Sequence, residues 1–103
     1  MITKDAFFKK VDGLKNQTIT SKSGSSSYSD IIRTNNICIG IRSGSSGSEF
    51  KLNLDELYKA YEKSANLNTK SLIEFMGKKR CRSAAIAIMM AANLLDEYGN
   101  TLK

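Results

Sequence analysis

Residues 83–95 read Ser-Ala-Ala-Ile-Ala-Ile-Met-Met-Ala-Ala-Asn-Leu-Leu, and this apolar run decides how the rest of the chain is arranged. A helix that is apolar on almost every side is usually central in its domain. Ala84, Ala87 and Ala91 lie three and four positions apart, so they form a small-residue face that another element can approach closely. We therefore predict a buried helix that ends near Gly99. Its apolar stretch of about 12 residues is too short to cross a bilayer, and we expect no membrane partner.

Four cations in five positions stand directly before this helix, in the sequence Lys-Lys-Arg-Cys-Arg at 78–82. The free N–H groups and the dipole of a helix N-terminus favour anions, so cations there weaken the helix end unless an anion lies between them. Phosphate is a common anion at such a position. The candidate phosphate-binding residues are Lys78, Lys79, Arg80 and Arg82, together with the N–H and hydroxyl groups of Ser83. The plainer interpretation of the cluster is a solvated turn between two helices.

The distribution of charge singles out the same cluster. The 103-residue chain has a formal net charge of +6 and an isoelectric point of about 9.4. The net charge is +4 over residues 1–48, −1 over 49–77, +4 over 78–82 and −1 over 83–103. A basic balance of this kind suits a nucleic acid, an anionic lipid or an acidic protein.

Two cations in predicted strands, Arg33 and Arg42, are second-rank candidates for the same surface. They would extend it if they face the same way as the basic cluster. The Gly/Ser segment 43–48 has peptide N–H groups that can wrap a phosphate, although it lacks the GxxxxGK[ST] pattern.

Three more helices are expected outside the central one. The first covers residues 3–14, with Thr3 as its cap and Phe and Val residues on one face. The second begins at Asn53 and carries an amphipathic Leu/Tyr stripe. A third, shorter helix is predicted to be capped by Thr69 and closed by Gly77.

The order of the elements predicts one α+β domain over residues 1–103. Strand composition or alternating apolar residues mark four strands, at residues 17–20, 28–33, 37–42 and 50–52. The order α-β-β-β-β-α-α-α is typical of a small antiparallel sheet of three to four strands packed against helices.

The residue types argue against an enzyme. The chain has no His, the commonest general base and metal ligand, and its acids form no metal-binding pattern. Cys38 and Cys81 do not make a disulfide framework, and Cys38 is predicted to be a small buried residue of an apolar strand. We expect no catalytic residue, no cofactor and no metal. Residues 1–5 begin no secretory signal, so we expect a cytoplasmic protein.

Three segments also resemble a known kind of small domain. They read Ile-Gly-Ile-Arg-Ser-Gly-Ser-Ser-Gly at 39–47, Leu-Asp-Glu-Leu-Tyr-Lys-Ala-Tyr at 54–61 and Arg-Ser-Ala-Ala-Ile at 82–86. Over residues 15–95 or so, the chain resembles the small accessory domains that accompany restriction endonucleases and phage or mobile-element proteins, without the attached nuclease part. The resemblance implies a nucleic-acid-linked role and identifies no catalytic residue.

These observations predict a non-catalytic module that binds nucleic acid through phosphate contacts, with DNA favoured over RNA. The alternative is a protein-interaction module, phage- or defence-related, for an acidic partner. It would use the apolar helix with Met89 and Met90, or an edge of the sheet. A homodimer through the same helix stays open.

Overall fold

The computed structural model confirms the predicted element order and the α+β class. It describes residues 2–21, 24, 26–43, 48–77 and 81–102. Four antiparallel strands form one sheet, in the order β1 (Ile19–Thr20), β2 (Ser27–Thr34), β3 (Ile37–Ser43) and β4 (Glu49–Asn53). The helices are α1 (Lys4–Asp12), α2 (Leu54–Lys63), α3 (Ile73–Met76) and α4 (Arg82–Ala91).

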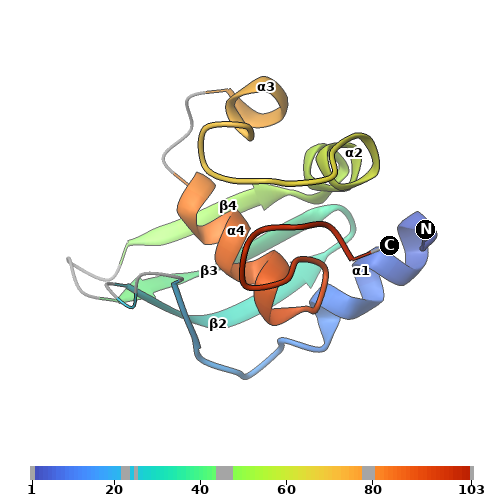
Figure 1. Cartoon of the computed structure of the whole chain (residues 1–103). Coiled ribbons are helices and arrows are strands. Elements are labelled where there is room, and N and C mark those ends of the chain that lie inside the picture. The colour runs from blue at the N-terminus through green and yellow to red at the C-terminus, as the bar shows by residue number, and fades with distance from the viewer. Residues whose placement is uncertain (1, 22–23, 25, 44–47, 78–80, 103) are drawn as a thin grey trace.

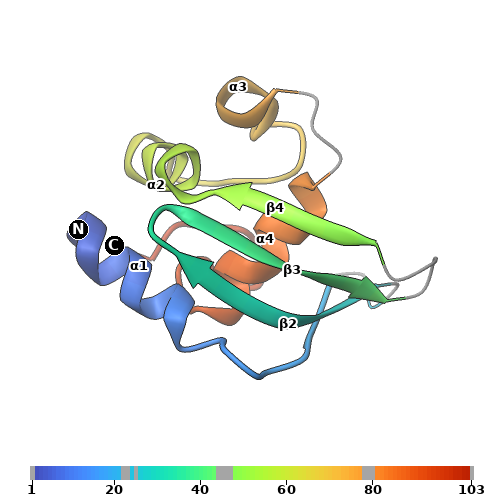
Figure 2. The ribbon, with the colours of Figure 1, turned by 180° about the vertical axis from the view of Figure 1, so that it is seen from behind.

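The two faces of the sheet have different surroundings. Helix α4 crosses one face (Figure 1), and the view from behind shows no helix of the described chain over the other face (Figure 2). Cys38 and Leu52 pair in register and are fully buried under α4, whereas Ile32 is 46% exposed on the opposite face. No helix within the described ranges is long and apolar enough to span a membrane.

A β-bulge in β2 keeps two large side chains on the α4 side of the sheet. Between Ser29 and Ile32, β2 has one residue more than its partner strand β3. Asp30 takes φ 53° there, a left-handed conformation that Asp adopts more readily than most residues. Because of the extra residue, Tyr28 and Ile31 are both buried, although a regular strand would point them to opposite faces.

The start of α2 is fixed by its cap and by the turn between β2 and β3. The Asn53 side-chain oxygen accepts hydrogen bonds from the N–H groups of Asp55 and Glu56, at 2.9 and 3.3 Å. The carbonyl of Asn36, in the turn, accepts from the N–H of Leu54 at 2.7 Å. The predicted Asn53 cap is therefore confirmed.

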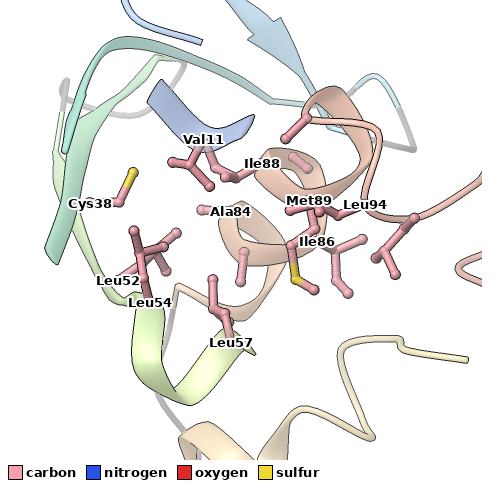
Figure 3. Close-up of a cluster of buried hydrophobic side chains, with 14 of the residues drawn as sticks. Val11, Cys38, Leu52, Leu54, Leu57, Ala84, Ile86, Ile88, Met89 and Leu94 are labelled. Carbon is pink, nitrogen blue, oxygen red and sulfur yellow. The ribbon is translucent and has the colours of Figure 1, made fainter. Parts of the chain in front are cut away.

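The prediction of a central α4 is also confirmed. Every residue from Ala84 to Met89 is buried, and Ile88 and Met89 are fully buried. Side chains from α1, the sheet and α2 surround this helix; those labelled with it in Figure 3 are Val11, Cys38, Leu52, Leu54 and Leu57. Burial holds the pKa of the Cys38 thiol at about 11, so this cysteine stays protonated. Met89 belongs to the core and is not a surface for a partner.

The predicted end of the last helix is wrong: α4 ends at Ala91, well before Gly99. Asn93 takes φ 60°, and the N–H of Leu94 donates to the carbonyl of Met89 at 2.8 Å. This is a Schellman C-cap, with Asn in the left-handed position usually taken by Gly. The apolar pattern continues into Leu94 because the chain folds back over the core, where Leu94 is fully buried.

The predicted cap of the short helix is also wrong. Thr69 does not cap α3, which has Leu72 at its N-cap position and no side-chain cap. The side-chain oxygen of Asn68 instead accepts from the N–H groups of Lys70 and Ser71, both at 2.9 Å. This Asx turn precedes α3 in the chain. The residue whose side chain binds the backbone there is therefore Asn68, one position before the predicted Thr69.

Aromatic packing and one ion pair attach α1 to the rest of the fold. The Phe7 ring lies 5.3 Å from the ring of Tyr58 and 5.4 Å from that of Tyr61, measured between centroids. Arg33 of β2 donates to both carboxylate oxygens of Asp12, at 2.6 and 2.8 Å. These hydrogen bonds hold the pKa of the Asp12 carboxyl below its usual value.

The core role of α4 predicts a large loss of stability for Ile88→Ala. Removing a fully buried Ile side chain leaves a cavity, so the free energy of unfolding should fall by about 2–5 kcal/mol. Ile32→Ala on the uncovered face is the matched control and should cost about 1 kcal/mol or less. Urea unfolding measures both. Equal losses for the two variants would contradict the central position of α4.

The Asp12–Arg33 pair predicts a pH-dependent contribution to stability. Because the folded pKa of Asp12 lies below its ordinary value of 3.8, the contribution is present above that value and lost as pH falls through the folded pKa. The pair is partly exposed, so Asp12→Asn should lower the free energy of unfolding by only about 0.5–1 kcal/mol at pH 7. Urea unfolding of both proteins at pH 7 and at about pH 3 tests this. A difference of the same size at both pH values would refute it.

Candidate functional site

A cavity of about 660 Å³ opens beside α4. Ser83, Ile86 and Met90 supply its helical wall, because spacings of three and four residues place them on one side of the helix. The other walls come from the segment 66–69 between α2 and α3, from residues near the ends of β1, β2 and β3, and from Tyr98. The cavity thus joins segments that are far apart in the sequence.

Arg42 contributes a cation to the cavity wall. It pairs in register with the buried Tyr28, which places it on the side of the sheet that α4 covers. Its Nη2 donates to Ser26 Oγ at 3.1 Å. No acidic side chain pairs with Arg42 within the described chain, and a guanidinium has five N–H donors. The exposed Arg42 can therefore bind an anion through its other N–H groups.

The N-terminus of α4 adjoins this wall. Its N-cap residue, Cys81, makes no side-chain cap hydrogen bond, and its Sγ donates to the carbonyl of Lys51 at 3.4 Å. Ser83 is exposed in the first turn of the helix and lines the cavity. N–H groups of a first helical turn attract anions, so this end of the cavity favours negative charge.

The segment 66–69 is held from both sides. Arg82 Nη1 donates to the carbonyl of Thr69 at 2.5 Å, which ties the segment to the start of α4. Asn66 Nδ2 donates to the carbonyl of Tyr98 at 3.0 Å, and the N–H of Leu67 donates to the carbonyl of Gly99 at 2.8 Å. Backbone and side-chain hydrogen bonds within the fold therefore hold this wall of the cavity in place.

The C-terminal segment adds an exposed tyrosine to the cavity lining. Tyr98 is 71% exposed and lines the cavity. Its backbone is fixed by Asp96, whose carboxylate accepts from the N–H groups of Tyr98 and Asn100, both at 2.9 Å. The hydrogen bond from the Asn100 side chain, with those from the backbone, lowers the pKa of Asp96. The turn therefore stays anchored at neutral pH.

The structure brings together three of the predicted site residues and separates a fourth. Ser83 and Arg42 line the same cavity, and Arg82 lies beside it through its bond to Thr69. Arg33 is paired with Asp12 near α1. Since Arg33 pairs in register with Cys38, about 14 Å of strand separates it from Arg42. Figure 1 shows α1 at the end of the sheet opposite the start of α4.

The other candidates, Lys78, Lys79 and Arg80, lie outside the described residues, as do residues 44–47 of the Gly/Ser segment. Their sequence position directly before Cys81 is what relates them to the site.

Sequence reasoning missed the polar and aromatic lining. Asn66, Asn68 and Tyr98 belong to segments without hydrophobic periodicity, where only composition gives a signal. Tyr98 could have been singled out from the sequence as an aromatic residue between acidic residues and a Gly, outside any amphipathic pattern. In the described ranges, no three His, Cys, Asp or Glu side chains gather as a metal site.

Comparisons with protein families, with curated proteins and with solved structures found no match to this chain.

The tight contact between Gly99 and the segment 66–69 predicts that adding one methyl group at Gly99 destabilises the protein. Gly99 has φ 86°, and a Cβ there would lie 2.5 Å from the carbonyl oxygen of Leu67. Gly99→Ala should therefore lower the free energy of unfolding by about 1–3 kcal/mol. Gly24→Ala is the control, because Gly24 also has a positive φ, 75°, and no atom of the described residues lies within 4 Å of a Cβ built there. Equal losses in thermal or urea unfolding would show that the contact with Leu67 does not matter.

Proposed function

We propose that this protein is a non-catalytic nucleic-acid-binding module that contacts phosphates at the start of α4 and at the Arg42 wall of the cavity. The observation that carries the proposal is the meeting of Arg42 with Ser83 in one cavity, next to Arg82. These residues come from β3 and from the start of α4, and a shared surface for them is not required by the core.

The electrostatics of this end of the molecule favour a polyanion. In the sequence, Lys78, Lys79 and Arg80 directly precede Cys81, the N-cap residue of α4. These three residues carry most of the +4 charge of residues 78–82. Arg42 has no acidic partner in the described chain, whereas Arg33 is neutralised by Asp12. Phosphate groups supply the negative charge that such a surface lacks.

Phosphate contacts position a nucleic acid without reading its sequence. Arg42 can present two parallel N–H groups to a phosphate, and Ser83 can add a hydroxyl donor at the start of the helix. We therefore expect binding that depends strongly on salt and weakly on sequence, with DNA as the first polymer to test.

Replacing Arg42 by Gln should weaken binding to DNA of any sequence and reduce the slope of log affinity against log salt by about one. Fluorescence anisotropy at about 50 and 200 mM salt measures both quantities. Lys51→Gln removes the same charge from the exposed side of β4 and is the control, because Lys51 lies in register beside Ile39 on the uncovered face. Equal slopes for wild type, R42Q and K51Q would exclude Arg42 from the interface.

A second candidate function is a protein-interaction module, and the uncovered sheet face is the observation that favours it. Ile32 is 46% exposed there and pairs in register with Ile39, which itself pairs with Lys51. An apolar partner surface would cover such a patch. Association that survives moderate salt and is lost in Ile32→Lys would favour this function over nucleic-acid binding.

A further inference from the structure

Resting on the proposed function, we infer that the cavity beside α4 receives one unstacked base of a single-stranded nucleic acid, so that the protein prefers single strands to duplexes. Phosphate contacts alone need only a convex basic surface. This protein instead has a hollow of about 660 Å³ next to its cations, within the usual size range of small-ligand pockets. Paired bases stay inside a duplex, but an unstacked base can enter such a hollow.

The lining has the mixed chemistry that a base requires. Ile86, Met90 and Leu67 give apolar surface for the faces of a ring. Tyr98 is an exposed residue of the lining, and its aromatic side chain is of the type on which single-stranded bases commonly stack. Arg42 lies on the sheet wall, where it can hold the phosphate of the same nucleotide.

Two asparagine side chains keep hydrogen-bonding atoms that the fold does not use. Asn68 accepts two backbone N–H groups with its oxygen, so its Nδ2 remains a donor without a partner in the described chain. Asn66 donates through Nδ2 to the carbonyl of Tyr98, so its oxygen remains an acceptor. In each side chain, the hydrogen bonds to the backbone determine whether the oxygen or the nitrogen of the amide remains available to a ligand. A donor and an acceptor on one wall can match the edge of a base.

Tyr28 adds a hydroxyl group to the cavity wall. It lines the cavity and is only 1% exposed, with its ring packed edge-on against Phe50 at 5.5 Å between centroids. Within the described residues the Tyr28 hydroxyl makes no hydrogen bond, and its oxygen is not one of the fully buried polar atoms that lack a partner. The hydroxyl therefore has access to the cavity and can donate one hydrogen bond there. A base carbonyl or a sugar hydroxyl in the cavity would accept it.

The test compares probes of equal length and fluorescent label by anisotropy: a single-stranded oligonucleotide, its duplex, and a sugar–phosphate oligomer of the same charge without bases. We expect the single strand to bind about tenfold more tightly than the abasic oligomer, because stacking of one base accounts for a difference of that order. Unlabelled mononucleotide should compete only weakly, since it lacks the neighbouring phosphates.

The matched variant is Tyr98→Leu, which keeps an apolar side chain at an exposed position. It should weaken binding of the single strand about five- to tenfold and leave binding of the abasic oligomer unchanged. Ile73→Ala, an exposed apolar change in α3 outside the cavity lining, is the control and should alter neither. Unchanged melting temperatures would show that both variants fold.

The outcomes separate this inference from the function on which it rests. Salt-dependent binding of equal strength to single strand, duplex and abasic oligomer would keep the phosphate-contact proposal and overturn the base-binding cavity. Mononucleotide binding that needs Tyr98, without tighter binding of the strand, would also overturn it. Absence of binding by every probe at low salt would overturn the proposed function itself.

Discussion

Burial of α4 against one face of the sheet is the constraint on which the rest of the structure depends. Its residues from Ala84 to Met89 are all buried, so the sheet, α1, α2 and the C-terminal segment must each cover part of it. The small Ala side chains let the helix lie close to the sheet, and the bulge at Asp30 turns both Tyr28 and Ile31 toward it. The sheet, α1, α2 and the C-terminal segment are arranged around this one helix.

The same constraint produces the candidate site. Ser83, Ile86 and Met90 lie along one side of α4, where the segment 66–69 and the C-terminal segment leave a hollow. Arg42 and several small polar side chains line this hollow beside the start of the helix. A helix buried for stability thus presents its polar N-terminus at the edge of the core, next to Arg42 of β3.

Local patterns in the sequence predicted the elements well, and long-range contacts explain where they failed. Thr3 and Asn53 cap their helices as expected, because a cap depends only on residues within one turn. The end of α4 was placed too late, because Leu94 continues the apolar pattern while Asn93 reverses the chain. Neither the hydropathy of Leu94 nor that of its neighbour reveals a left-handed backbone.

The site was only partly predictable for the same reason. Ser83 and Arg42 were identified by their charge or position, but their shared cavity depends on contacts between segments 40 or more residues apart. The pairing of Arg33 with Asp12 joins β2 to α1, and no spacing rule connects these two residues. Tyr98 carries no periodic signal at all. Residue type predicted which side chains can bind phosphate, and the fold determines which of them meet.

The most direct test of the central claim is an NMR titration of the ¹⁵N-labelled protein with a short single-stranded oligonucleotide. Amide shifts report which surface the ligand contacts, residue by residue. We expect the largest shifts at Ser83, Thr69 and Tyr98 around the cavity, with Ile32 on the uncovered face unchanged. Shifts confined to the uncovered face, or no shifts at low salt, would contradict the account.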